Sequence, residues 1–186
     1  LEEIISNLDK DFDLDFRFVG NSKDSDISFY FDTEININGS GDILGLTVLN
    51  SDNNRKYWEI FVDVPAFSGD KNYLKYALVH ELGHTLGLEH PFENSDGDLW
   101  KGINSPWLSA FPEDTIMAYR NPRGGNWPNI FSSNDMNALK SVWPEEINLG
   151  NKNVVYKFNN TTNLKDLLSY WFDSIETGKL QTTDLY

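Results

Sequence analysis

The stretch DKNYLKYALVHELGHTLGLEH, residues 70 to 90, decides how the middle of this 186-residue chain folds. It predicts one long helix that Ser68 or Asp70 can cap at its start. Gly87 marks the end of the helix, because glycine adopts the left-handed conformation without the penalty of a Cβ atom. We therefore expect the chain to turn sharply after this glycine.

All three histidines of the chain lie within this stretch. His80 and His84 are four residues apart, so they lie on one face of the helix and can bind one metal ion. His90 returns from the turn to complete the set, while Glu81, about 100° around the helix from His80, comes close to the metal without being a ligand. The pattern H-E-x-x-H-x-x-G-x-x-H fixes five positions and would arise by chance in about one in 10^5 chains of this length. It is therefore more than a set of polar residues on a helix surface, and three imidazoles with an open position for water are typical of a catalytic zinc site.

The sequence HELGHTLGLEH resembles the zinc signature of the metzincin peptidases. That family carries a methionine turn beneath the metal, for which residues 114–120 (DTIMAYR) supply Met117. Pro91, directly after His90, and Tyr119, two residues after Met117, are similar to serralysins. Matrixins, the alternative subfamily, typically have proline in place of this tyrosine, and astacins would have glutamate in place of Pro91. The resemblance is thus to a serralysin-like catalytic domain.

The resemblance implies a secreted zinc-dependent endopeptidase, in which zinc-bound water attacks the peptide bond. Glu81 would be the catalytic base, and Tyr119 a displaceable metal ligand that donates a hydrogen bond to the oxyanion. Two other functions are a catalytically silent zinc-binding module, which usually loses its base, and a zinc hydrolase of a non-peptide amide. An extended substrate needs the edge of a strand, and the candidate by analogy is a segment that could also be a buried interior strand. It consists of Gly45, Leu46, Thr47 and Val48.

Alternating apolar and polar residues predict several strands in the first third of the chain, between a short N-terminal helix and the histidine helix. The expected elements are a helix at 1–10, strands at 12–19, 26–31, 43–50 and 57–64, a helix at 132–143, a strand at 153–158 and an amphipathic helix at 164–175. The fold class is therefore α+β. By resemblance it is metzincin-like, with a mixed twisted sheet, a long active-site helix, a C-terminal helix and zinc in a cleft between two subdomains.

The family likeness runs over about residues 1–145, which we expect to be the catalytic domain. Residues 146–186 form an extension of unknown role, with a strand and an amphipathic helix. The chain begins at Leu1, without an initiator methionine or a signal peptide, which is expected of a processed product.

The net charge of −14 argues against nucleic acid as a partner, because phosphates would repel the chain. No apolar run approaches the roughly 20 residues that span a bilayer, so we expect no membrane insertion. The absence of cysteine excludes disulfides and thiolate metal sites. The expected partners are a polypeptide substrate and a propeptide or protein inhibitor outside this chain.

Two further groups of residues follow the histidines in the aperiodic segment 91–131. Glu93, Asp96 and Asp98 form an acidic loop that either binds Ca²⁺ or is merely solvated. Three tryptophans either wall a specificity pocket together with Tyr119 or pack in the core. They are Trp100, Trp107 and Trp127.

Overall fold

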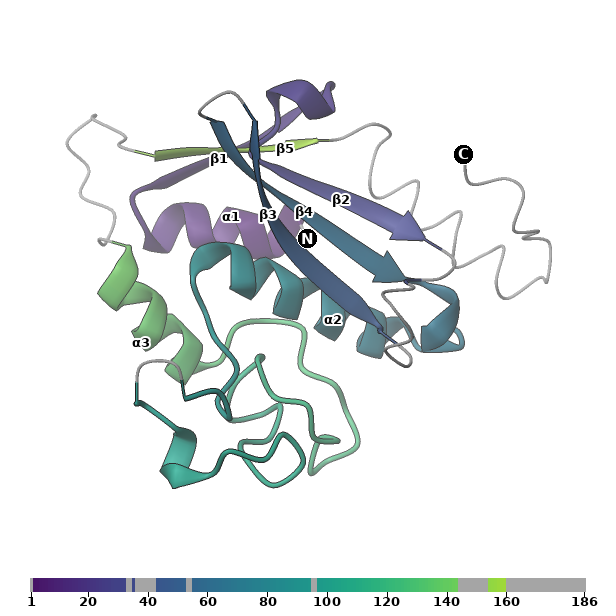
Figure 1. The fold of residues 1–186 in the computed structure, drawn as a ribbon, viewed down its shortest axis with the longest axis vertical. Helices are drawn as coiled ribbons and strands as arrows, with labels where there is room; N and C mark the ends of the chain where they lie inside the picture. The colour runs from purple at the N-terminus through teal and green to yellow at the C-terminus, as the bar shows by residue number, and fades with distance from the viewer. Residues whose placement is uncertain are drawn as a thin grey trace.

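A computed structural model describes residues 2–32, 35, 43–52, 55–94 and 97–143, together with the backbone of 154–159. The elements are, in chain order, α1 (Glu2–Asp11), β1 (Leu14–Val19), η1 (Ser22–Asp24), β2 (Ile27–Asp32), β3 (Gly45–Asp52), β4 (Arg55–Asp63), η2 (Pro65–Phe67), α2 (Lys71–Leu86), η3 (Trp100–Gly102), α3 (Ser133–Val142) and β5 (Val154–Asn159). The helices α1 and α2 lie along the same face of the sheet (Figure 1). The α+β class is therefore confirmed.

The five strands form one mixed sheet in the order β1-β5-β2-β4-β3. The strands β1, β5, β2 and β4 run parallel, whereas β3 runs antiparallel to β4, with Leu46 opposite Phe61. Among the strands that the structure describes, β3 is the outermost, and residues 45–48 are half-buried, so the interpretation of this segment as a buried interior strand is wrong. The candidate substrate segment therefore lies on a strand at the edge of the described sheet.

The core lies between the sheet and the helices α1 and α2. Leu14 from β1 and Ile60 from β4 are buried, as the alternating pattern predicts. Strict alternation would bury Phe16 and Phe18 together with Leu14, but Phe16 is half-buried and Phe18 is 38% exposed. The apolar face of β1 is therefore covered mainly at its start.

Helix α2 begins and ends as its caps require. The Asp70 carboxylate accepts hydrogen bonds from the backbone N–H groups of Asn72 and Tyr73, both at 3.0 Å, so Asp70 rather than Ser68 is the N-cap. Gly87 has a φ of 101°, a left-handed conformation that favours glycine, and it ends the helix. The chain after α2 therefore turns back toward the helix face that carries the histidines.

The loop after α2 leads to α3, which begins at a capping box formed by Ser132 and Asp135. Trp143, just after α3, donates a hydrogen bond from Nε1 to the backbone carbonyl of Leu86 at 2.8 Å, which ties the two helix ends together. Val142, three residues after the buried Leu139, is 54% exposed. It lies in the last turn of the helix.

The strand expected at 153–158 is present as β5 and lies between β1 and β2. The boundary at residue 145 stays a prediction, and the first strand beyond it belongs to the same sheet as the strands before it. The amphipathic helix expected at 164–175 lies outside the described residues. None of the described helices is long and apolar enough to cross a membrane.

Candidate metal centre

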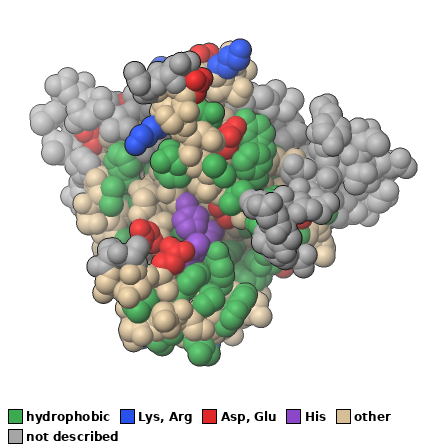
Figure 2. Space-filling view, viewed as in Figure 1, with side chains coloured by type: hydrophobic (Ala, Val, Ile, Leu, Met, Phe, Trp, Pro, Cys, Tyr) green, Lys and Arg blue, Asp and Glu red, His purple; other side chains and the backbone are tan. Residues whose placement is uncertain are grey.

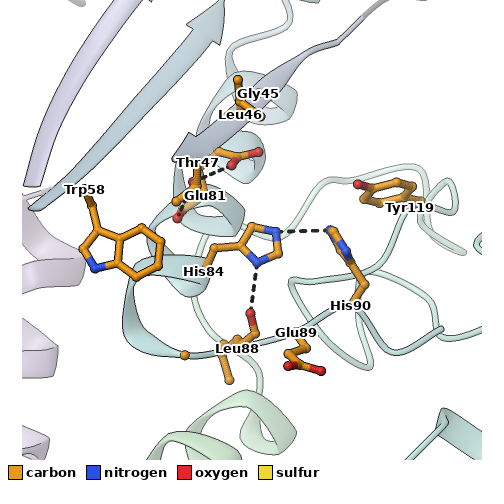
Figure 3. Close-up of a pocket in the computed structure, with 11 residues that line it drawn as sticks. Gly45, Leu46, Thr47, Trp58, Glu81, His84, Leu88, Glu89, His90 and Tyr119 are labelled. Atoms are coloured by element: carbon orange, nitrogen blue, oxygen red, sulfur yellow. Dashed lines mark hydrogen bonds between the residues drawn. The ribbon is translucent and has the colours of Figure 1, made fainter. Parts of the chain in front are cut away.

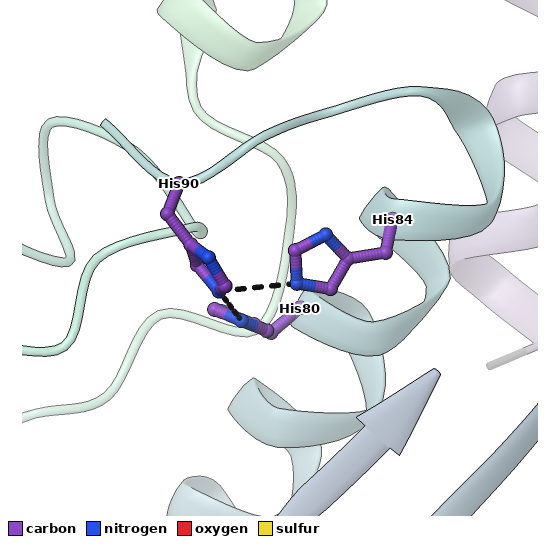
Figure 4. Close-up of side chains that lie close together, drawn as sticks. All are labelled: His80, His84 and His90. Atoms are coloured by element: carbon purple, nitrogen blue, oxygen red, sulfur yellow. Dashed lines mark hydrogen bonds between the residues drawn. The ribbon is translucent and has the colours of Figure 1, made fainter. Parts of the chain in front are cut away.

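The three histidine side chains converge on one point beside α2 (Figure 4). His80 and His84 extend from successive turns of the helix, and the turn at Gly87 brings His90 back to face them. The Nε2 atom of His90 lies 3.2 Å from Nε2 of His80 and 3.1 Å from Nε2 of His84. Each histidine offers one ring nitrogen that could bind a metal ion, and these three nitrogens all lie within 4.8 Å of one another.

In each of these rings the other nitrogen, Nδ1, meets an oxygen acceptor. Carbonyl and carboxylate oxygens only accept hydrogen bonds, so Nδ1 carries a proton and Nε2 of the neutral ring is left with a lone pair. This arrangement fixes ring orientation in metal sites. The acceptors for His80, His84 and His90 are, in that order, the Ile116 carbonyl at 2.8 Å, the Leu88 carbonyl at 3.0 Å and the Glu93 carboxylate at 2.7 Å.

The histidine cluster fits a tetrahedral metal ion. Zinc–nitrogen bonds of about 2.0–2.1 Å place two ligand nitrogens about 3.3 Å apart, close to the Nε2 separations found here. In the metal-free protein, burial and then the charges of the neighbouring rings lower the pKa of His80 well below its usual value and that of His84 to about 4. Neutral rings leave lone pairs facing one another, which is unfavourable unless a cation lies between them. The residues present therefore fit zinc.

Glu81 lies next to the cluster and is 6% exposed. Its Oε2 accepts a hydrogen bond from Thr47 Oγ1 at 2.7 Å (Figure 3). Burial raises the pKa of this carboxyl to about 7, although the bond from Thr47 lowers it. A carboxylate whose pKa lies near neutrality can both take up and release a proton. Among the described residues, the group of side chains close enough together to hold a metal ion consists of the three histidines and does not include Glu81.

Tyr119 lies beside the histidines, with its ring centre 5.7 Å from that of His80 and 4.8 Å from that of His90. The residue is 42% exposed. Partial burial, followed by the charges of Glu81 and Glu93, raises the pKa of its phenol to about 12. The phenol therefore keeps its proton at neutral pH and can donate a hydrogen bond. Its roles as a metal ligand and oxyanion donor stay predictions.

Met117 lies beneath α2 and is buried. Its sulfur packs against the helix at Gly83, where a Cβ atom would lie 2.7 Å from Sδ. This contact explains why the helix carries a glycine one residue before His84, since a larger side chain would displace the sulfur. The role of Met117 as a methionine turn stays a prediction.

The turn that contains Met117 is held by a buried carboxylate of α3. Asp135 accepts hydrogen bonds from the Ile116 backbone N–H at 2.9 Å and from the Thr115 hydroxyl. The Ile116 carbonyl in turn accepts the bond from His80. Sequence reasoning missed Asp135, although its place three residues after the N-cap Ser132 is a recognisable capping signal.

Two pockets adjoin the cluster, one of about 440 Å³ and one of about 430 Å³. Gly45, Glu81 and Tyr119 line both. Histidine side chains lie in the hollow at the middle of this face, bordered by acidic and hydrophobic groups (Figure 2). Of the predicted substrate segment, Leu46 and Thr47 line the first pocket, whereas Val48 lines neither. Binding of substrate there stays a prediction.

The three tryptophans have separate outcomes. Trp107 and Trp127 line the second pocket, whereas Trp100 lines neither. Trp127 also stacks on Tyr73, with ring centres 4.1 Å apart, and packs against the core. Trp127 therefore both lines a pocket and packs against the core.

Of the three residues of the acidic loop, the structure describes Glu93 and Asp98. The Glu93 carboxylate lies 2.7 Å from Nδ1 of His90. Asp96 lies outside the described residues, so calcium binding stays a prediction. The contact between Glu93 and His90 was not predicted from the sequence. The available signal was the position of Glu93 three residues after a candidate metal ligand.

Part of the chain is similar to serralysins. It is 29% identical over 99 residues to a serralysin of Photorhabdus laumondii, and the matched region covers 48% of this chain and 21% of that protein. It is 31% identical over 106 residues to serralysin A of Dickeya chrysanthemi, covering 51% and 21%, and 30% identical over 105 residues to a serralysin of Proteus mirabilis, covering 50% and 20%. The similarity suggests a zinc metalloprotease.

The similarity spans about a fifth of the length of these curated relatives. No protein-family model and no solved structure matches the chain. The cluster of three histidines also suggests zinc binding.

Proposed function

We propose that this chain carries the catalytic domain of a secreted zinc-dependent endopeptidase of the metzincin type, serralysin-like rather than matrixin-like. One observation carries the proposal. The Nε2 atoms of three imidazoles converge, with Nε2 of His90 3.2 Å from that of His80 and 3.1 Å from that of His84, and the buried residue Glu81 follows His80 directly in the chain. The cleft between two metzincin subdomains belongs to the same proposal.

His80, His84 and His90 would hold the Zn²⁺ ion through Nε2. Bound zinc would supply a Lewis acid that polarises the scissile carbonyl and lowers the pKa of the attacking water. Glu81 takes the proton from that water and passes it to the leaving amine. The pKa of about 7 for its carboxyl in the metal-free protein supports both halves of this transfer.

Tyr119 would be a displaceable ligand that donates a hydrogen bond from its phenol to the oxyanion. Its place beside His80 and His90 supports this role, and so does the exposure of its ring, since a partly exposed phenol has room to move. A tyrosine at this position is also the reason to prefer the serralysin-like assignment.

An extended polypeptide would add to β3 along Gly45 to Val48, at the edge with which no described strand pairs. Main-chain pairing of this kind gives affinity for peptides of many sequences. The position of β3 at the end of the sheet, beside Glu81, supports this assignment. The net charge of −14 argues against a nucleic acid in the same cleft. Control by a propeptide or a protein inhibitor is part of the same proposal.

Digestion of casein by the protein, with zinc content measured in the same samples, tests the proposal. We expect about one zinc ion per chain, cleavage that stops on removal of zinc by a chelator, and recovery on addition of Zn²⁺. Zinc binding without cleavage of casein or a peptide library would indicate a silent binding module. Hydrolysis confined to non-peptide amides would indicate the third function.

A further inference from the structure

The strand β3 contacts the Glu81 side chain directly. Thr47 Oγ1 lies 2.7 Å from Oε2 of Glu81 and 3.1 Å from its backbone carbonyl oxygen. A hydroxyl has one proton, and both of these neighbours are acceptors, so Thr47 is the donor in this contact. In the described part of the chain, it provides the one side-chain hydrogen bond to the Glu81 carboxylate.

Gly45, two residues before Thr47, contacts the other oxygen of the same carboxylate. Residues two apart in a strand point to the same face of the sheet. A Cβ atom at position 45 would lie 2.4 Å from Oε1 and 2.9 Å from the carboxyl carbon of Glu81. Only a residue without a side chain leaves this space, so the carboxylate depends on both positions of β3.

The two contacts distinguish the two oxygens of Glu81. Oε2 accepts the Thr47 hydroxyl, whereas Oε1 lies over Gly45 and no described side chain donates a hydrogen bond to it. A carboxylate with one oxygen bound and the other unbound presents a defined lone pair for proton transfer, and such orientation contributes strongly to rate.

We propose that Thr47 is the positioning residue of the catalytic base: its hydroxyl holds Oε2 of Glu81, Gly45 leaves room for Oε1, and Oε1 is the atom that takes the proton. This inference rests on the proposed endopeptidase function. The strand whose edge would bind the substrate then also orients the base.

The Thr47→Val variant tests the inference, because it replaces the hydroxyl by a methyl group of nearly the same size. Thr47→Ser restores the hydroxyl. Ser51→Ala removes a hydroxyl from an exposed position on the same face of β3, away from Glu81. The measurements are kcat and KM for a peptide substrate and the dissociation constant for zinc.

We expect Thr47→Val to lower kcat by roughly 10- to 100-fold, with KM within about twofold and zinc affinity unchanged. Thr47→Ser should recover most of the rate, and Ser51→Ala should match the wild type. A Thr47→Val variant with kcat within twofold of the wild type overturns the inference. Wild-type protein that binds zinc but cleaves no peptide overturns the proposed function instead.

A second measurement does not depend on activity. The Thr47–Glu81 contact is tested in metal-free protein by a double-mutant cycle of melting temperatures for Thr47→Val, Glu81→Ala and the double variant. If the contact orients Glu81, the shift in the double variant differs from the sum of the two single shifts. Additive shifts show that the two side chains do not interact in solution and contradict the inference.

Discussion

The backbone carbonyl oxygen of Ile116 accepts a hydrogen bond from Nδ1 of His80 at 2.8 Å. The backbone N–H of Ile116 donates to the carboxylate of Asp135 at 2.9 Å. One peptide segment therefore connects a buried carboxylate at the start of α3 to a histidine on α2. The orientation of the His80 ring depends on a residue 55 positions later in the chain, because the turn at 115–117 lies between them.

We predict that Asp135→Asn weakens both the fold and the metal site. The amide has nearly the same shape but is neutral. If its oxygen accepts from the backbone N–H groups of Ile116 and Ser132, its NH₂ group takes the place of the acceptor for the Thr115 hydroxyl. Loss of a hydrogen bond to a buried charged group costs on the order of 1–3 kcal/mol. Urea unfolding measures the stability, and competition with a chelating dye measures zinc affinity. Asn137→Ala, exposed on the same helix, is the control, and an equal effect of both variants on zinc affinity would contradict the account.

Glu93→Ala is expected to weaken zinc binding about tenfold. Carboxylates that accept a hydrogen bond from a ligand histidine usually contribute 10- to 100-fold to affinity, and the lower end is expected because the Glu93 side chain is 49% exposed. Glu93→Gln keeps an acceptor for Nδ1 of His90 and should lose less. Glu3→Ala, with the same change in charge on α1, should have zinc affinity equal to that of the wild type. Unchanged affinity in Glu93→Ala would show that the contact does not orient His90.

Local signals in the sequence predict the parts of the site that lie on one element. The spacing of His80 and His84 predicts two histidines on one helix face, and Gly87 predicts the turn that returns His90. The structure brings the three side chains together. The start of α2 was predicted only to within Ser68 or Asp70, because both side chains can cap a helix. The choice depends on η2, which occupies the preceding turn and leaves Ser68 at its end.

Contacts between distant elements had no signal of this kind. Thr47 was predicted to lie in a strand for substrate binding, but its side chain reaches Glu81 only because β3 packs beside α2. A strand at 153–158 was predicted, yet the place of β5 between β1 and β2 depends on parallel pairing with residues far away in sequence. Glu93 was placed in an acidic loop that either binds Ca²⁺ or is solvated, and its contact with Nδ1 of His90 was not predicted.

The metal-free protein should lose stability through its histidines as the pH falls. Folding lowers the pKa of His80 and His84 below the unfolded value, in the case of His84 to about 4, so the unfolded chain binds more protons. This contribution is absent above about pH 6.5, grows as the pH falls toward 4 and is then constant for His84. It amounts to on the order of 1–3 kcal/mol for one histidine.

Urea unfolding of chelator-treated protein between pH 7 and 4.5 measures this effect. Glu81 acts in the opposite direction over the same range, because burial raises the pKa of its carboxyl to about 7. The informative quantity is therefore the difference between the wild type and His84→Asn, which lacks one titrating ring. We expect a weaker loss of stability at low pH in His84→Asn, and parallel curves would contradict the prediction.

Tyr119→Phe should retain zinc and lose turnover. Removal of one oxyanion donor typically lowers kcat by about 10²–10³, and KM should change little because the phenol acts mainly in the transition state. The ring is 42% exposed, so only a small change in melting temperature is expected. If Tyr119 is merely a packing residue, kcat stays within a fewfold. That outcome would remove the main reason to prefer a serralysin-like over a matrixin-like assignment.

The rate of peptide cleavage by Glu81→Ala, compared with the wild type at equal zinc content, tests the central claim most directly. Glu81 lies next to the histidine cluster without belonging to it, so its loss should leave the metal in place and remove the base. We predict full zinc occupancy and a kcat at least about 100-fold below that of the wild type. A variant that binds zinc and keeps more than about a tenth of the wild-type rate would contradict the account, because another group would then be the base.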